Sequence, residues 1–444
     1  MTVPKPPEHI AGVLRRLAGG GYEAYLVGGC VRDSIMGRQT HDWDVASSAT
    51  PEEVCHLFRK TATTGEKYGT VSVILPECVV EVTTFRREGS YRDGRRPEIV
   101  EFVTRINEDL SRRDFTMNAM AASLSTELID PYGGLADIGN RVIRCVGDPS
   151  SRFSEDALRM LRAFRFRAEL GFEIEAETLK SMLSNSQSAG RISPERVRVE
   201  LEKTLLSERP ETAWDMIEAG LLDNYIPRCC SAQETRAVMP EASSISYVLP
   251  EPQISGAGSL AALSRLPAEA ALRWCAFCAI LITRRMIGSG GEFLRSLRLD
   301  AKTIKACCAA VPIAVDSEIC GALTGGSDGI ASGGGTPVAV AAPDRVTIKK
   351  LLAARGIPAV RCAAAASDAL RGSNSLSHVE SIIGSGECFS LRELAISGGD
   401  LIELGCSAGA ALGGKLGDLL DYVISHPECN TREKLIKLAS CDML

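Results

Sequence analysis

The pattern of hydrophobic and polar positions changes about a third of the way along the 444-residue chain. Between Tyr22 and Cys145, short apolar runs rich in β-branched residues alternate with stretches of helical period, which is typical of an α/β domain. From Asp156 onward strand character stops, and apolar residues recur at helical spacing. The pattern predicts an α+β chain with an α/β head and an all-helical remainder. We expect strands over residues 24–27, 43–46, 70–75, 79–84, 99–103 and 121–124.

A glycine pair follows the first predicted strand. Gly28 and Gly29 supply the backbone freedom that a tight turn after a strand requires. The run from Cys30 to Met36 then carries apolar residues at helical spacing, so the glycines lie just before a helix N-terminus. Because the first amides of a helix have no acceptors within it and favour phosphate, the sequence predicts an anion-binding turn here.

Two aspartates flank Trp43 a little further along the chain. In an extended strand, residues two apart point to the same side, so Asp42 and Asp44 project together. Such close like charges repel unless a divalent cation lies between them, and Mg²⁺ suits a site beside substrate phosphates. Glu81 lies inside a β-branched run and is a candidate third ligand, because a carboxylate there needs a partner. An acidic strand edge without a metal is the alternative.

Further motifs follow in a fixed order. They are RRDFTMNA at 112–119, DPYGG at 130–134, EDALRMLR at 155–162 and SPER at 193–196. Together with the glycine pair and the carboxylate strands, they resemble the class II CCA-adding tRNA nucleotidyltransferases and their relatives, the bacterial poly(A) polymerases. The resemblance covers roughly residues 25–202. It implies a nucleotidyltransferase head of the polymerase β type, followed by an all-helical neck, body and tail.

The chemistry of such an enzyme assigns roles to these residues. Asp42, Asp44 and Glu81 would be the catalytic residues and hold two Mg²⁺ ions, which lower the pKa of an attacking 3′-hydroxyl and neutralise the leaving pyrophosphate. The arginines of the RRD motif can bind triphosphate oxygens through the two N–H groups that a guanidinium presents side by side. The resemblance implies that the aspartate of this motif accepts a hydrogen bond from a ribose hydroxyl. A surface ion pair is the alternative for this motif. The nucleotide-binding residues that we expect are Gly28, Gly29, Arg32, Arg112, Arg113, Asp114, Asn118, Asp156, Arg159, Arg162 and Arg165.

Two residues of the EDALRMLR motif suggest how a base is chosen. The spacing predicts an amphipathic helix capped by Ser154, on which Asp156 and Arg159 are neighbours. A carboxylate acceptor beside a guanidinium donor matches the amino group and bare ring nitrogen that cytosine and adenine both present, whereas uracil and guanine present the reverse. This protein template would accept CTP and ATP and reject UTP and GTP, since mispaired buried groups stay unsatisfied. A helix-stabilising ion pair is the alternative.

Irregular stretches divide the chain further. The charged stretch 85–97 predicts a mobile loop, and in the family such a loop accompanies enzymes that add the terminal adenosine. Residues 229–260 and 321–343 lose periodicity and predict loops or insertions. We expect four parts: a catalytic head over 1–145, a helical neck with the base template over 146–210, a helical body over 211–330 and a tRNA-binding helical tail over 331–444.

Composition limits the partners and the compartment. A formal net charge of −6 argues against an indiscriminate nucleic-acid binder, although Arg345, Lys349 and Lys350 begin a basic stretch that we expect to contact RNA. The N-terminus lacks a signal-peptide pattern and no run reaches transmembrane length, which predicts a cytoplasmic protein without membrane contact. The 16 cysteines are scattered, and Cys275 and Cys278 read as buried free thiols rather than metal ligands.

The combined prediction is template-independent addition of CCA to tRNA 3′ ends from CTP and ATP, with tRNA held at its acceptor end and elbow. No protein partner is evident from the sequence. A poly(A) polymerase, or an enzyme that adds only A or only CC, is the nearest alternative because the catalytic motifs overlap. The sequence lacks the long basic extension of some poly(A) polymerases, which favours CCA addition. A noncatalytic RNA-binding protein of the same fold is the more distant alternative, since it would not need three carboxylates.

Overall fold

The computed structural model describes residues 5–40, 42–65, 68–88, 100–125, 127–226, 260–315 and 344–440. These form two compact units, each of which is considered by itself. The first contains the described residues up to Thr204 and Asp215–Asn224, and the second contains Leu205–Trp214 and the described residues from Tyr225 onward. Residues 89–99, 227–259 and 316–343 lie outside the described residues, and with them most of the predicted loops. The expected division into four parts stays a prediction.

The first unit begins with a seven-stranded mixed sheet in the order β3-β4-β5-β2-β1-β8-β9. Its strands are β1 (Ala24–Val27), β2 (Asp44–Ser47), β3 (Thr61–Gly65), β4 (Thr70–Ile74), β5 (Val79–Thr84), β8 (Ala121–Ala122) and β9 (Leu128–Ile129). The central strand β2 runs antiparallel to β1 and parallel to β5. Two small sheets pair β6 (Arg86–Glu88) with β7 (Val100–Phe102) and β10 (Val142–Ile143) with β11 (Glu173–Ile174). All six predicted strands are present, whereas the short β3, β6, β9, β10 and β11 were not predicted.

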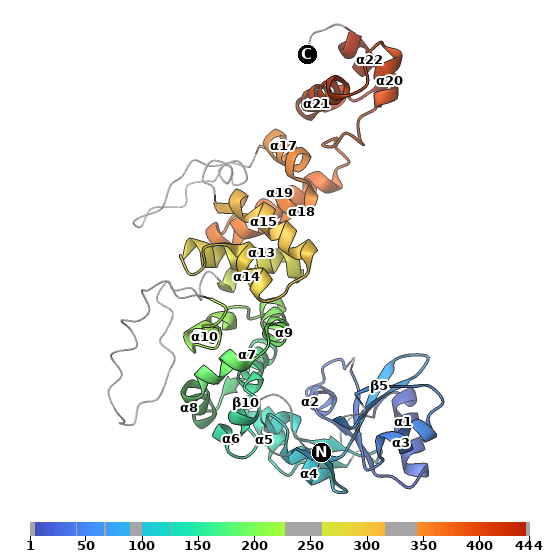
Figure 1. The fold of residues 1–444 in the computed structure, drawn as a ribbon, viewed down its shortest axis with the longest axis vertical. Helices are drawn as coiled ribbons and strands as arrows, with labels where there is room; N and C mark the ends of the chain where they lie inside the picture. Colours follow the sequence, from blue (N-terminus) through green and yellow to red (C-terminus); the bar gives the residue numbers. More distant parts are fainter. Residues whose placement is uncertain are drawn as a thin grey trace, which may run out of the picture. The chain divides into compact units, whose positions relative to one another are not determined.

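The sheet buries hydrophobic side chains on both faces. The helices of the head are α1 (Glu8–Gly19), α2 (Gly29–Ile35), α3 (Pro51–Leu57) and α4 (Ile106–Ser111). Helices α1, α2 and α3 share one hydrophobic cluster with the sheet, in which Leu14 and Val45 are fully buried. Figure 1 shows α1 and α3 side by side next to the strands of the head. Leu110 of α4 belongs with Ala46 to a second cluster on the opposite face. Because side chains alternate along a strand, Asp44 shares the face of Ala46, toward α4.

Helices dominate the rest of the first unit. They are the 3₁₀ turn η2 (Thr116–Asn118), α5 (Gly134–Asn140), α6 (Pro149–Glu155), α7 (Leu158–Leu170), α8 (Ala176–Ser184), η3 (Ser186–Arg191), α9 (Pro194–Leu206) and α10 (Thr212–Glu218), the last two of which reach into the second unit. The predicted start of a helix at Ser154 is wrong, because Ser154 lies inside α6. The cap of α6 is instead Asp148, whose carboxylate accepts from the amide of Ser151 at 2.8 Å.

The second unit consists of helices in its described part. They are η4 (Ala262–Arg265), α13 (Ala270–Thr283), α14 (Gly290–Ser296), α15 (Ala301–Val315), α17 (Arg345–Arg355), α18 (Ile357–Arg371), α19 (Ser375–Gly384), α20 (Gly398–Glu403), α21 (Ala410–Ser425), η5 (Pro427–Cys429) and α22 (Arg432–Ser440). Helices α13, α15 and α18 pack together, and small buried side chains such as Ala363 let them approach closely. Cys275 and Cys278 are buried free thiols, as predicted.

The predicted fold class, an α/β head followed by helices, is confirmed. Every strand of the seven-stranded sheet precedes residue 130, and among the described residues only the two-residue β10 and β11 come later. No helix in the described ranges is both long and apolar enough to span a bilayer.

Candidate active site

Asp44 and Glu81 lie in register at the centre of the sheet. Their Cα atoms are direct partners in the parallel pair β2–β5, and both side chains are exposed. Partial desolvation raises the pKa of the Asp44 carboxyl, and the negative charges of Glu81 and Asp42 act in the same direction, whereas the Arg113 guanidinium opposes them. The predicted acids therefore share one region of repulsive charge. Within the described ranges, however, no three His, Cys, Asp or Glu side chains are gathered closely enough to hold a metal ion.

Gly28 is the point at which the backbone turns from β1 into α2. Its φ of 77° lies in the left-handed region that favours glycine, and it caps the helix that Gly29 begins, as predicted. A Cβ at Gly28 would lie 2.9 Å from Nη1 of Arg113, so a side chain here would push the guanidinium away. Gly28 thus allows both the turn and the approach of Arg113.

A buried aspartate fixes the two arginines that follow α4. Asp109 is fully buried, and its Oδ1 accepts from Nε and Nη2 of Arg112 at 3.0 and 2.7 Å. Its Oδ2 accepts from Nη2 of Arg113 at 3.2 Å. Burial alone would raise the pKa of Asp109, but the two guanidinium groups hold it below its usual value. The sequence prediction missed Asp109, although an acid three and four residues before two arginines was the signal for it.

Four predicted nucleotide-binding residues form one hydrogen-bonded chain. Arg32 Nη1 donates to Oδ1 of Asn118 at 2.7 Å, and Asn118 Nδ2 donates to Oδ1 of Asp114 at 3.1 Å. From the other side, Arg162 Nε donates to Oδ2 of Asp114 at 2.7 Å. Burial would raise the pKa of Asp114, yet the Arg162 charge and these hydrogen bonds hold it well below its usual range. The predicted contact of Asp114 with a ribose hydroxyl stays a prediction.

Arg165 completes a group of three arginines around the ring of Phe166. The Cζ atoms of Arg32, Arg162 and Arg165 lie 5.1, 5.3 and 4.2 Å from the ring centroid. Arg165 also forms an ion pair with Glu200 of α9, with 2.8 Å between Nε and Oε2. Neither Phe166 nor Glu200 was predicted as a site residue.

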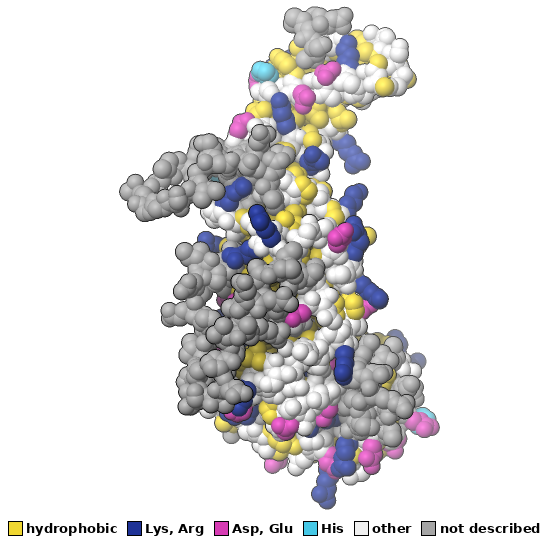
Figure 2. All heavy atoms as spheres, turned by 60° about the vertical axis from the view of Figure 1, so that its left-hand side comes forward, with side chains coloured by type: hydrophobic (Ala, Val, Ile, Leu, Met, Phe, Trp, Pro, Cys, Tyr) yellow, Lys and Arg dark blue, Asp and Glu magenta, His cyan; other side chains and the backbone are white. Residues whose placement is uncertain are grey.

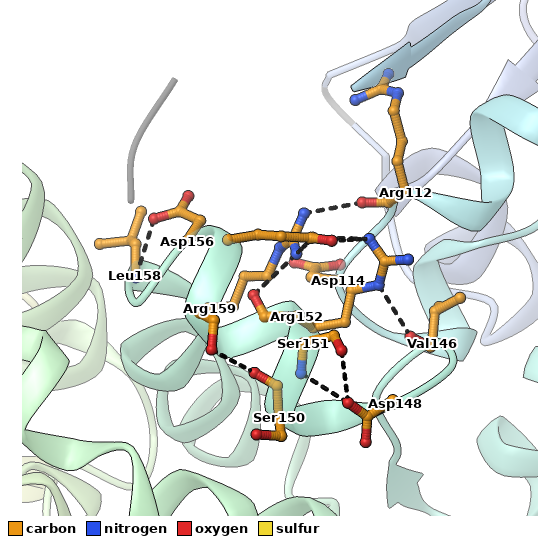
Figure 3. A network of polar contacts seen from close by, with 12 residues as sticks. Arg112, Asp114, Val146, Asp148, Ser150, Ser151, Arg152, Asp156, Leu158 and Arg159 are labelled. Atoms are coloured by element: carbon orange, nitrogen blue, oxygen red, sulfur yellow. Dashed lines mark hydrogen bonds and ion pairs between the residues drawn. The ribbon is translucent and has the colours of Figure 1, made fainter. Parts of the chain in front are cut away.

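Arg159 lies in a polar network at the start of α7 (Figure 3). Its Nη1 donates to Oε2 of Glu155 at 2.5 Å and to the carbonyl of Arg152 at 3.0 Å, and its Nη2 donates to the carbonyl of Arg112 at 2.9 Å. These bonds tie α7 to the arginine motif after α4. Glu155 also binds Nη1 of Arg152 at 2.7 Å, so it orients both cations. The sequence prediction missed Glu155, for which the spacing of four residues to Arg159 was the signal.

Asp156 lies in the break between α6 and α7, so the prediction that it shares a helix with Arg159 is wrong. Its Oδ1 accepts from the amide of Leu158 at 3.1 Å, because a short carboxylate side chain competes for helix-terminal amides. Arg196 of α9 binds Oδ1 and Oδ2 of Asp156 at 3.1 and 2.6 Å. Figure 3 shows the side chains of Asp156 and Arg159 on either side of this helix start. Their joint role as a base template stays a prediction.

The basic residues proposed for RNA contact differ in orientation. Lys349 is buried; its Nζ donates to the carbonyl of Ile424 at 2.7 Å and lies 3.1 Å from Glu387, so its predicted RNA contact is wrong. It belongs to the inward face of α17 and stabilises the last turn of α21. Arg345, which pairs with Glu387, and Lys350 are exposed, and their RNA contact stays a prediction. On the face drawn in Figure 2, Lys and Arg side chains of the described residues are spread among acidic and hydrophobic ones.

Comparison with known proteins decides the family. Residues 24–144 match the family described as "Poly A polymerase head domain", and residues 171–232 match "Probable RNA and SrmB- binding site of polymerase A". The CCA-adding enzyme of Limosilactobacillus fermentum is 35% identical over 438 residues, which are 99% of this chain and 98% of the relative. The chain belongs to the CCA-adding enzyme family. The family resemblance predicted from the sequence is thereby confirmed.

Other CCA-adding enzymes match over different shares of their length. The one from Pediococcus pentosaceus is 46% identical over 225 residues, 51% of this chain and 57% of that protein, so this match spans little more than half of the relative. A crystal structure of the Bacillus stearothermophilus CCA-adding enzyme in complex with CTP has a TM-score of 0.75 and 31% identity, and the match covers 98% of this chain and 97% of that one. Family membership thus rests on likeness along the whole chain.

Proposed function

We propose that this chain adds CCA to the 3′ ends of tRNA from CTP and ATP and releases pyrophosphate. The observation that carries the proposal is the likeness to a CCA-adding enzyme over 99% of the chain. The solved relative from Bacillus stearothermophilus holds CTP, which supports CTP as a substrate here. A cytoplasmic location, expected from the sequence, is part of the same proposal.

Asp42 and Asp44 are the proposed metal ligands, with Glu81 in register beside Asp44. Mg²⁺ commonly takes one or two protein carboxylates and completes its shell with phosphate oxygens and water. This donor set fits such an ion, although no closed cage of three protein ligands exists among the described residues. When bound, the metal supplies the positive charge that lowers the pKa of the attacking 3′-hydroxyl and neutralises pyrophosphate.

The arginines have the complementary role of holding the triphosphate. Asp109 holds Arg113 beside Gly28, and the charge of Arg113 acts on Asp44. A triphosphate here would exchange the electrostatic contact of Arg113 with Asp44 for charge-assisted hydrogen bonds to phosphate. Arg162, oriented by Asp114, provides a second guanidinium on the neck side of the site.

Base choice is the proposed role of Asp156 and Arg159. Arg196 and the amide of Leu158 hold the carboxylate, while Glu155 and backbone carbonyls hold the guanidinium. Both groups are therefore fixed before a nucleotide enters. A fixed acceptor and donor discriminate between bases, because the wrong base leaves them unsatisfied.

The decisive experiment offers the purified chain tRNA that lacks one, two or three terminal nucleotides, with each nucleoside triphosphate alone and with CTP and ATP together. We expect CC followed by A on the shortest tRNA, no extension beyond CCA and no use of UTP or GTP, read by sequencing the products. Homopolymeric A tails without C would identify a poly(A) polymerase. Products that stop at CC, or A added only to a CC end, would identify a partial enzyme.

A noncatalytic RNA-binding role predicts a different pattern. The chain would bind tRNA, the Asp42→Ala variant would bind it equally well, and neither would release pyrophosphate. Pyrophosphate release by the parent chain that is lost in Asp42→Ala, at unchanged tRNA affinity, contradicts that role.

A further inference from the structure

Phe166 lies at a point where three guanidinium groups converge from two helices. The ring is buried, with 4% of its surface exposed, and Arg32 of α2 and Arg162 and Arg165 of α7 all lie within the range of a cation–π contact. Phe166 also meets the ring of Phe115 edge-on, at 5.8 Å between centroids and 88° between planes. Phe115 directly follows Asp114, so this aromatic pair joins α7 to the arginine motif.

Gathering three cations in a partly buried site is electrostatically costly. Burial lowers the pKa of Arg165, and the nearby charge of Arg162 lowers it further, against the opposing effect of Glu200. Each arginine has an acidic partner: Asp33 for Arg32, Asp114 for Arg162 and Glu200 for Arg165. These carboxylates offset the charge, but Asp33 and Asp114 also accept hydrogen bonds from Arg32 and Arg162 and so occupy N–H donors of these two arginines.

An aromatic ring attracts a guanidinium without occupying any of its hydrogen-bond donors, because it acts through the π face. A further acid in place of Phe166 would hold the arginines and also take donors away from a ligand. An aliphatic side chain would leave the donors available but would not attract the cations. The ring therefore meets both requirements at once.

We infer that Phe166 is a positioning residue for nucleotide binding, whose ring holds Arg32, Arg162 and Arg165 together as one triphosphate-binding group. This inference rests on the proposed function, in which Arg162 holds the triphosphate, and extends that role to Arg32 and Arg165, which the sequence also predicts to bind the nucleotide. The ring touches no substrate and acts through the arginines. Its loss should therefore weaken binding of the triphosphate, whichever base is attached, and leave the chemical step nearly unchanged.

The test compares Phe166→Leu with the matched control Phe172→Leu. Phe172 is equally buried and carries one arginine, Arg141, at 5.6 Å from its ring centroid, but it is not part of the site. Phe166→Leu should raise the KM of both CTP and ATP about tenfold and change kcat by less than about threefold. The control should leave both constants unchanged. Inorganic tripolyphosphate, which has neither base nor ribose, should compete about tenfold less well in Phe166→Leu only.

A second variant covers the case in which Phe166→Leu does not fold, as judged by circular dichroism and thermal unfolding. Replacing Phe166 by 3,4,5-trifluorophenylalanine keeps the shape of the ring and weakens its negative π face. It should raise the same KM values in a normally folded protein. Unchanged KM values in either folded variant, or an equal rise in Phe172→Leu, would overturn the inference.

Failure of the proposed function is visible separately. If the parent chain incorporates neither CTP nor ATP, the proposed activity fails, whereas calorimetric binding of tripolyphosphate still tests the role of the ring. If the parent chain incorporates both and the variants match it, the activity stands and the inference about Phe166 fails.

Discussion

The first unit contains two groups of carboxylates that differ in how their charge is balanced. Asp44 lies in register with Glu81 at an exposed strand start, and its pKa is raised. Asp109 and Asp114 are buried behind arginines, and the pKa of each is lowered. The first group is left repulsive by the protein itself, whereas the second is satisfied internally. Under the proposed function, the repulsive group is where a cation would bind, and the satisfied group contains the residues that orient the arginines.

The contrast follows from the elements that carry the acids. Parallel neighbouring strands place Asp44 and Glu81 side by side, and the Arg113 guanidinium, which is not part of the sheet, offsets part of their charge. By contrast, Asp109 lies on α4, three and four residues before Arg112 and Arg113, so its partners come with the helix. The pair β2–β5 thus brings two negative charges together, whereas the spacing along α4 places positive partners beside Asp109.

Removing an acid from the repulsive group should give the largest functional effect. We expect Asp44→Asn to lower single-turnover incorporation of CTP by at least about 10²-fold, since a group that stabilises charge at the reacting phosphate is lost. Its thermal stability should be equal or higher, because the desolvation of a charged carboxylate and its repulsion from Glu81 are both relieved. Glu77→Gln, at an exposed turn between β4 and β5, is the control and should change neither property. A variant that is destabilised but active would contradict the assignment of Asp44 to the repulsive group.

Removing an acid from the satisfied group should lower stability and leave kcat nearly unchanged, which is the opposite of the result expected for Asp44→Asn. Asp114→Asn leaves Arg162 with a neutral partner in a buried site, so we expect a loss of about 1–3 kcal/mol in the free energy of unfolding, measured with urea. Incorporation should suffer through a higher KM for CTP, because Arg162 is no longer oriented, rather than through kcat. Unchanged stability together with a large fall in kcat would place Asp114 among the reacting groups instead.

The same contrast explains which features of the site could be predicted from the sequence alone. The turn at Gly28 was predictable, because local period and backbone geometry determine it, whereas the register of Asp44 with Glu81 depends on how two strands far apart in the chain pair. The break at Asp156 was not predictable, since a side-chain cap there outweighs the helical period. The burial of Lys349 could not be predicted either, because a basic stretch is normally exposed. Only the packing of α17 against α21 brings Lys349 to the backbone carbonyl that it binds.

The inferred role of Phe166 in nucleotide binding could not be predicted from the sequence for a related reason. In the sequence it is one apolar residue of a predicted helix, and its residue type alone does not distinguish it from a core residue. What sets it apart is the convergence of Arg32 from α2 with two arginines of its own helix, which depends on how the two helices meet. The functional role of an acid or a glycine can be predicted from its residue type. The role of a ring that orients arginines is visible only from its contacts in the structure.

The smallest expected effect, a pH dependence of stability, separates the two groups most directly. An acid whose folded pKa is raised, such as Asp44, destabilises the fold above its unfolded pKa near about 3.9, and protonation relieves this. An acid whose folded pKa is lowered, such as Asp114, stabilises the fold above that value, and the contribution is lost as the pH falls below it. In metal-free buffer, the gain in unfolding free energy of Asp44→Asn should therefore shrink as the pH is lowered from 7 toward 4. The deficit of Asp114→Asn should persist to about pH 4 and shrink only below it, so parallel curves for the two variants would refute the distinction between the groups.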